Sequence, residues 1–226
     1  MNINDFKNLE LQSGDRLNNI FVRQAELMEK YHKIEDKNGL LQTPDIPVNL
    51  HDSKGQARLK DFAWRVTEEL GEALEAIRIH PDIPEHYNEE LADGLHFLTE
   101  MTILSGMVPD ILVYNAPKGF SRDRLEKLYA IAKNEYEGVS ARVYHALVFR
   151  TGKTVEALAL TCNTLKNKPW KQSQMITDEA YFRQNLCTSW VRFIQLALCA
   201  RINSDLLYDL YFRKSEVNKF RQRSNY

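Results

Sequence analysis

The chain has 226 residues, enough for one domain with a sizeable buried core, and its formal net charge at pH 7 is −1. Proteins that bind duplex nucleic acid through bulk charge are usually basic, so this balance argues against that class of function. No uncharged apolar run approaches the ~18 residues that a membrane-spanning helix needs, and the first residues lack a secretory signal pattern. Cys162, Cys187 and Cys199 have no metal-ligand spacing, which predicts reduced thiols in a cytoplasmic protein.

Apolar residues recur at helical spacing along most of the chain, and alternating strand patterns are missing. The sequence therefore predicts an all-α helical bundle that forms a single domain over residues 1–226. A loop with several Gly and Pro residues follows the first predicted helix, and a linker with Pro109, Pro117 and Gly119 follows the third. The predicted helices, in chain order, cover about 15–36, 57–80, 86–106, 122–136, 140–167, 178–202 and 204–222.

A weak internal repeat divides this domain into two halves, about 15–106 and about 120–226. Segment 65–77 is similar to 150–162, and segment 91–112 is similar to 189–210, but the second copy lacks the acidic residues of the first. Two amphipathic helices can look alike without common origin. A true duplication predicts a pseudo-symmetric bundle with one acidic half and one half used for another purpose.

Two neighbouring predicted helices each carry a pair of acids three residues apart. Glu69 and Glu72 lie in "EELGEALEAI", and Glu90 and Asp93 lie in "EELADGLHFL". On a helical wheel at about 100° per residue, Glu69 and Glu72 border the apolar face of their helix. Glu90 falls inside the apolar stripe of the next helix and Asp93 lies at its edge, whereas Glu89 is predicted to point away.

The short link with Pro81 and Pro84 predicts an antiparallel hairpin that brings the two acidic pairs together. Carboxylates that converge in a bundle interior repel one another and cannot all stay ionised unaided. Oxygen ligands of this kind suit Mg²⁺, with Mn²⁺ as a substitute, and leave coordination positions for water and substrate phosphates. Any single glutamate is explained more simply as a solvated surface residue, but two facing pairs favour a metal site.

The spacing of the four acids resembles the ExxE…ExxD signature of the all-α nucleoside triphosphate pyrophosphatases, the superfamily of the MazG proteins and the dimeric dUTPases. The continuation "ELADGLHF" is more similar to the dUTPase branch, in which a histidine and an aromatic residue follow. The C-terminal "YFRKSEVNKFRQRSNY" resembles the closing motif of that branch, with Lys214, Asn218, Arg221 and Tyr226 in the matching positions. The resemblance covers roughly residues 15–226 and implies a homodimer that hydrolyses a nucleoside triphosphate.

The basic tail has two interpretations. Lys214, Asn218 and Arg221 share one helix face, where the resemblance implies that Lys214 and Arg221 hold phosphates and that Asn218 contacts the nucleotide. A solvated basic C-terminus that is favourable to the helix dipole is the alternative.

The resemblance also points to residues that would surround the nucleoside. His96 and Phe97 would line its pocket, although a buried core position is the commoner fate of such residues. Gln24 and Leu27 match a Q-x-x-L-N pattern whose polar residues help to bind uracil, but Met28 stands where that pattern has asparagine.

The segment "LKNKPWK" supplies another candidate group, Lys168, Trp170 and Lys171. A tryptophan between lysines can stack on a base or close over phosphates, and it can equally cap the core of a bundle.

Together these residues predict Mg²⁺-dependent hydrolysis of dUTP to dUMP and pyrophosphate, with Glu72 as the catalytic residue that orients or deprotonates water. Because Met28 stands where the uracil-binding pattern has asparagine, dCTP or a modified nucleotide is an alternative substrate. Two further alternatives are a non-catalytic helical interaction protein that retains the fold and a hydrolase for a non-nucleotide phosphoanhydride. The presence of all four acids argues against the first, and Asn218 with aromatic walls argues against the second.

Overall fold

The computed structural model describes residues 2–41, 43–81, 84–117, 119, 121–134, 143–166 and 176–224. These ranges contain helices and no strand, which confirms the all-α prediction. The elements in chain order are η1 (Ile3–Phe6), α1 (Arg16–Lys37), α2 (Ser53–Ile79), α3 (Pro84–Leu104), α4 (Pro109–Leu112), α5 (Arg124–Asn134), α6 (Val143–Thr164), α7 (Glu179–Cys199) and α8 (Ser204–Arg223).

The seven predicted helices are all present, and two short elements, η1 and α4, were not predicted. Asp15 caps α1 by accepting a hydrogen bond from the Asn18 backbone N–H, close to the predicted start. α2 begins earlier than expected because Asp52 caps it in the same way through the Gly55 backbone N–H. The sequence interpretation had placed Gly55 in the preceding loop.

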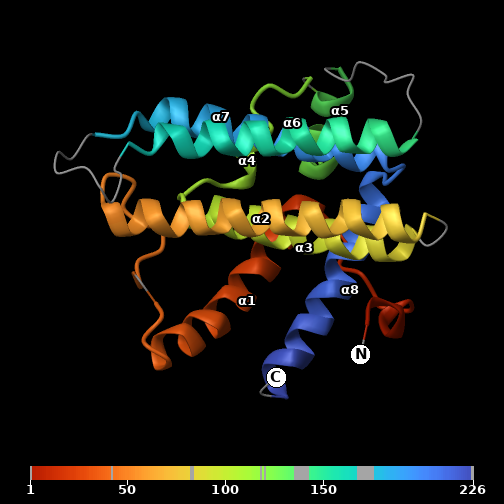
Figure 1. Ribbon diagram of the computed structural model, residues 1–226, viewed down its shortest axis with the longest axis horizontal. Coiled ribbons are helices and arrows are strands. Elements are labelled where there is room, and N and C mark those ends of the chain that lie inside the picture. The colour runs from red at the N-terminus through yellow and green to blue at the C-terminus, as the bar shows by residue number, and fades with distance from the viewer. Residues whose placement is uncertain are drawn as a thin grey trace.

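The long helices form two layers (Figure 1). α2 packs on α3 in one layer, and α6 packs on α7 in the other, with α5 against α7. α1 and α8 lie on the side of the α2–α3 pair that faces away from α6 and α7, and they contact each other and α3. The similar segments of the predicted repeat lie mainly on two helix pairs, α2–α3 and α6–α7. A common origin of these pairs stays a prediction.

The core joins the two layers through large side chains of α7. Trp190 is fully buried and donates a hydrogen bond from Nε1 to Oγ1 of Thr102 on α3, at 2.8 Å. Phe193 is also fully buried, and a Cβ placed on Gly94 would lie 3.4 Å from its ring. α7 therefore packs directly on α3 beside the acidic residues. The apolar segment 193–200, "FIQLALCA", accordingly packs against the acidic half of its own chain.

An ion cluster fixes the starts of α1, α5 and α8 relative to one another. Arg16 of α1 contacts Asp123 and Asp205 and donates a hydrogen bond to Glu126 at 2.9 Å. The two helices that reach away from the α2–α3 pair are thus tied together at their N-terminal ends.

Two further expectations concern the chain as a whole. The three cysteines, all within the described residues, are thiols rather than disulfides, as predicted. Within the described ranges, none of the helices combines the length and the apolarity needed to span a membrane.

Candidate active site

Three glutamates converge where α2 faces α3. Glu69, Glu72 and Glu90 each offer one carboxylate oxygen, and these oxygens lie within 4.8 Å of one another. Glu90 is buried as the apolar stripe predicted, Glu69 is half-buried, and Glu72 is exposed at the edge. Packing of the two helices therefore brings together three of the four acids that were predicted to form a metal site.

The fourth acid, Asp93, faces a lysine. Its carboxylate lies 2.6 Å from Nζ of Lys214, which comes from α8. The same Nζ donates a hydrogen bond to Glu89 at 2.7 Å. The prediction that Glu89 points away was wrong, because α8 packs against α3 and places Lys214 between the two acids. Lys214 is itself buried, so it balances the charge of these acids from within the protein.

The pKa values of the acids show that their convergence is electrostatically unfavourable. Burial, together with the charges of Asp93, Glu90 and Glu72, raises the pKa of Glu69 to about 8. Burial also raises the pKa of Asp93 to about 6, although Lys214 opposes the rise, and it raises the pKa of Glu90. Burial alone would lower the pKa of Lys214, but Asp93 and Glu89 outweigh it and raise that pKa. At neutral pH the cluster therefore retains a proton unless a cation replaces it.

A cavity of about 270 Å³ lies beside the acids, between α1, α2, α3 and α8. It combines carboxylates, two arginines, aromatic rings and uncharged polar groups, which suits a ligand with an anionic part and a planar part. The lining residues are Gln24, Leu27, Tyr31, Glu35, Arg65, Glu69, Asp93, His96, Phe97, Glu100, Asn218 and Arg221.

Five of the six described residues that were predicted to bind the substrate lie in this cavity wall, namely Gln24, His96, Phe97, Asn218 and Arg221. Lys214 is an exception, since its ammonium group is buried against Asp93 and Glu89. Lys168, Trp170, Lys171 and Tyr226 lie outside the described residues.

A buried hydrogen-bond network forms the inner end of the cavity. Oε1 of Gln24 lies 2.8 Å from Nδ1 of His96 and accepts a hydrogen bond from the Tyr211 hydroxyl at 2.8 Å. Nε2 of Gln24 donates to Glu100 at 2.9 Å. The His96 ring stacks on Tyr211 with 4.0 Å between ring centroids, and burial lowers the pKa of His96 to about 3. His96 is therefore a neutral imidazole at physiological pH.

Several lining residues were missed by the sequence interpretation. The guanidinium of Arg65 lies 4.8 Å from the centroid of the Phe62 ring and 5.7 Å from that of Phe97. Arg65 precedes Glu69 by four residues, and Glu100 follows His96 by four, so each shares a helix face with a residue that had been identified. That spacing was the available signal for both.

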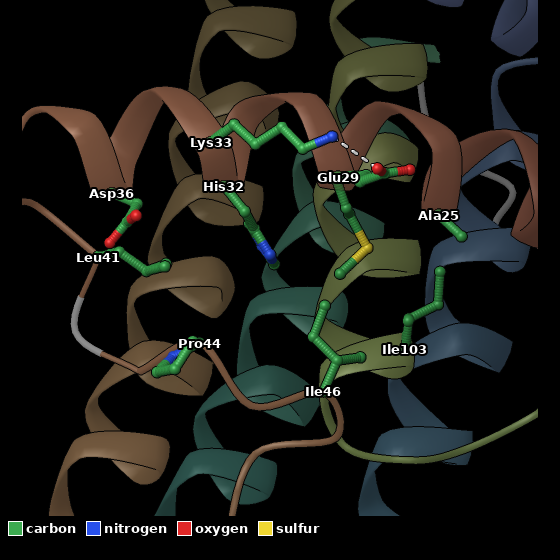
Figure 2. A pocket seen from close by; sticks show the side chains of 10 residues that line it. Ala25, Glu29, His32, Lys33, Asp36, Leu41, Pro44, Ile46 and Ile103 are labelled. Atoms are coloured by element: carbon green, nitrogen blue, oxygen red, sulfur yellow. Dashed lines mark hydrogen bonds and ion pairs between the residues drawn. The ribbon is translucent and has the colours of Figure 1, made fainter.

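Met28 lies on a different surface of α1. It is buried and lines a second cavity of about 360 Å³ with Ala25, Ile46 and Ile103 (Figure 2). Figure 2 shows Lys33 paired with Glu29 on the helix above this cavity. The methionine that departs from the uracil-binding pattern therefore adds no surface to the acid-lined cavity.

Comparison with known proteins identifies one family. The family model described as dUTPase matches residues 69–226, more than half of the chain. The matched region begins at Glu69 and includes α3 and α8, the helices that carry Glu90, Asp93 and Lys214. No curated protein and no solved structure gives a match.

Proposed function

The chain belongs to the dUTPase family, whose all-helical fold it shares, and from this premise we propose that it hydrolyses dUTP to dUMP and pyrophosphate with Mg²⁺. The observation that carries the proposal is the set of three carboxylates within 4.8 Å of one another beside a cavity with both cationic and base-sized polar walls. The raised pKa of Glu69 indicates that bringing these acids together is electrostatically unfavourable. A non-catalytic protein would gain nothing from this arrangement.

The donor set fits a hard divalent cation. Glu69, Glu72 and Glu90 would hold Mg²⁺, with Asp93 adjoining them, because carboxylate oxygens are the ligands that this ion prefers. When bound, the ion supplies charge neutralisation for phosphate oxygens and lowers the pKa of a coordinated water.

The side chains of the protein would divide the remaining work. Glu72 is the exposed member of the three glutamates, and its carboxylate would accept a hydrogen bond from the attacking water and orient it. Arg65 and Arg221 both line the cavity, and their guanidinium groups would donate to the triphosphate. Lys214 would act through Asp93 and Glu89, by holding their carboxylates in place, rather than as the phosphate ligand that the family resemblance implied.

The base would lie at the inner end of the cavity. Phe97 contributes an aromatic ring to the cavity wall, and Asn218 contributes an amide from α8. Nε2 of His96 is buried without a hydrogen-bond partner among the described residues, and His96 lines the cavity. A base with an N–H on its edge would satisfy that nitrogen, and uracil carries such a group at N3.

The test is a panel of nucleoside triphosphates with Mg²⁺, in which release of pyrophosphate and of the monophosphate is measured. We expect dUTP to be the preferred substrate and Glu90→Gln to lower kcat/KM at least about 100-fold, since a bound ion would lose a carboxylate ligand. Glu75→Gln is the matched control, because Glu75 is exposed on α2 and pairs with Arg78. Equal use of purine and pyrimidine substrates, or near-normal turnover by Glu90→Gln, would contradict the proposal.

A further inference from the structure

A buried carboxylate that the proposed chemistry does not use lies one helical turn beyond His96. Glu100 is 5% exposed and accepts a hydrogen bond from Nε2 of Gln24 at 2.9 Å. Its other oxygen lies 3.7 Å from Nε2 of His32. Burial of a carboxylate is costly, so its contacts call for a physical explanation.

The contact with Glu100 determines which end of the Gln24 amide donates and which end accepts in the other hydrogen bonds of the network. An amide has one accepting end and one donating end, whereas an ionised carboxylate can only accept. The NH₂ group of Gln24 must therefore face Glu100, and Oε1 must face His96 and Tyr211. Because Oε1 can only accept, the proton of the neutral imidazole must be on Nδ1 of His96, 2.8 Å away.

The other nitrogen of the ring is thereby left as a bare acceptor. Nε2 of His96 is buried, and no described residue makes a hydrogen bond of normal geometry to it, although the backbone of Tyr211 lies close enough to the ring to oppose the lowering of its pKa. Stacking on Tyr211, at 4.0 Å between centroids and 23° between planes, holds the ring in one orientation. The ring of His96 lines the cavity, and this lone pair is held in a fixed place within the wall, where neighbouring atoms cover it.

Positive charge lies on the far side of Glu100. Nη2 of Arg58 is 2.6 Å from Nε2 of His32, the atom that Glu100 approaches, and it also donates to Glu35 at 3.0 Å. The guanidinium is buried, and His32 and Glu35 beside it are partly buried. The side of Glu100 away from Gln24 thus faces His32 and, behind it, the guanidinium of Arg58.

We propose that Glu100 is a positioning residue that determines base specificity, because it fixes the Gln24 amide and hence the tautomer of His96. The inference rests on the proposed function and extends it. An acceptor at Nε2 pairs with the N3–H of uracil, but it faces a lone pair at N3 of cytosine. Discrimination between dUTP and dCTP would thus originate in a carboxylate of the cavity wall that acts through Gln24 and His96.

The experiment replaces the carboxylate by an amide. In Glu100→Gln the new side chain can donate or accept, so Gln24 can rotate and His96 can carry its proton on either nitrogen. We expect the ratio of kcat/KM for dUTP to that for dCTP to fall about 10-fold or more, the equivalent of one buried hydrogen bond. Glu29→Gln is the charge-matched control, since Glu29 is exposed on α1 and pairs with Lys33.

A second measurement does not depend on turnover. In the protein without metal or nucleotide, ¹⁵N NMR of labelled histidine shows which nitrogen carries the proton, and the His96 signal is identified by its loss in His96→Asn. We expect protonation at Nδ1 in the wild type and growth of the Nε2–H form in Glu100→Gln. Gln24→Met, which removes the same acceptor from the other side, should give the same change if Glu100→Gln fails to fold.

The outcomes separate the two proposals. An Nε2–H tautomer in the wild type, or an unchanged tautomer and an unchanged substrate ratio in both variants, would overturn the role of Glu100. Absence of dUTP hydrolysis by the wild type would instead refute the proposed function, while the NMR result would still decide whether Glu100 fixes the tautomer.

Discussion

The buried ammonium group of Lys214 contacts Asp93 and Glu89 at once, so its removal should be costly. Lys214→Met would leave two partly buried carboxylates without their partner. We expect a loss of about 3–5 kcal/mol in the free energy of unfolding of the metal-free protein. Urea denaturation at pH 7 measures this loss.

Lys33→Met is the control for that experiment. Lys33 and Glu29 form an exposed pair of the same kind on α1, and its removal should cost no more than about 1 kcal/mol. Equal stability of the two variants would mean that Lys214 does not hold the acids in solution.

The pH dependence of stability follows from the raised pKa values of the acids. Glu69 has a pKa of about 8 and Asp93 a pKa of about 6 in the folded protein, both above their ordinary values of 4.5 and 3.8. A carboxyl group whose pKa is raised by folding stabilises the protein below its unfolded pKa, and this contribution is lost as pH rises through the folded pKa. The metal-free protein should therefore lose stability between about pH 4 and pH 8.

Thermal unfolding in EDTA and in Mg²⁺ checks this expectation. Tm in EDTA should fall as the pH is raised toward 8, and Mg²⁺ should raise Tm more at pH 8 than at pH 5.5, because protons compete with the ion. Glu69→Gln should flatten the fall in EDTA. A Tm that rises with pH, or that ignores Mg²⁺ at pH 8, would argue against a coupled acidic site.

At this scale the sequence revealed the acids but not their counter-charge. The i,i+3 spacing was enough to identify Glu69, Glu72, Glu90 and Asp93, because it places each pair on one side of a helix. The contact between Lys214 and Glu89 joins residues 125 positions apart, and it exists only because α8 packs on α3. Helical periodicity carries no information about such a contact.

Among the helices, α2 shows a close fit at its first turn that can be tested. A Cβ on Gly55 would lie 2.4 Å from the backbone oxygen of Asn49 in the loop before the helix. Gly55→Ala must therefore displace backbone, and we expect a loss of about 1–3 kcal/mol in the free energy of unfolding.

Gly71→Ala, on the same helix, is the matched control. Nothing lies within 4 Å of a Cβ at Gly71, so alanine should stabilise the helix by about 0.5–1 kcal/mol. Denaturation of both variants under the same conditions measures the difference. Equal stability of the Gly55→Ala and Gly71→Ala proteins would show that the loop before α2 can move away from the helix without a cost in free energy.

Element boundaries illustrate the same limit of sequence information. The apolar period located all seven long helices, because each buries a continuous stripe. The start of α2 was misplaced because glycine next to a loop usually marks a turn, whereas here the lack of a side chain allows the loop to approach the helix.

For the molecule as a whole, we expect a homodimer formed through α6. This helix exposes Val148, Phe149 and Leu160, and the eleven-residue interval puts Phe149 and Leu160 at nearly the same angle around it. α6 also lies on the outer layer, away from α1 and α8 (Figure 1). A second copy of the chain would cover this apolar face.

Light scattering coupled to size-exclusion chromatography measures the assembly. The wild type should have the mass of a dimer, and Phe149→Glu should shift it toward the monomer, because a charge cannot be buried unpaired in an apolar interface. Val22→Glu is the control, since Val22 is equally exposed but lies on α1. A monomeric wild type would contradict the expectation.

The layered arrangement itself could not be derived from the sequence. Segment 193–200 was expected to pack against the acidic half, a second subunit, or both, and its apolar pattern fits each alternative. Burial of Phe193 and Ile194 inside one chain shows how the first alternative is realised. Which faces meet depends on the complementarity of side chains far apart in the chain, and periodicity describes only one helix at a time.

The tie between Lys214 and the acids also has a consequence for the order of events during synthesis. A ribosome adds roughly 5–20 residues per second, so the 125 residues between Glu89 and Lys214 take roughly 6–25 s to make. For most of that interval the α2–α3 hairpin has been made, but the lysine that balances its acids does not yet exist. The nascent hairpin must therefore stay open to water, keep its carboxyl groups protonated, or take up a cation from its surroundings. Its final closure must therefore wait until α8 has been made.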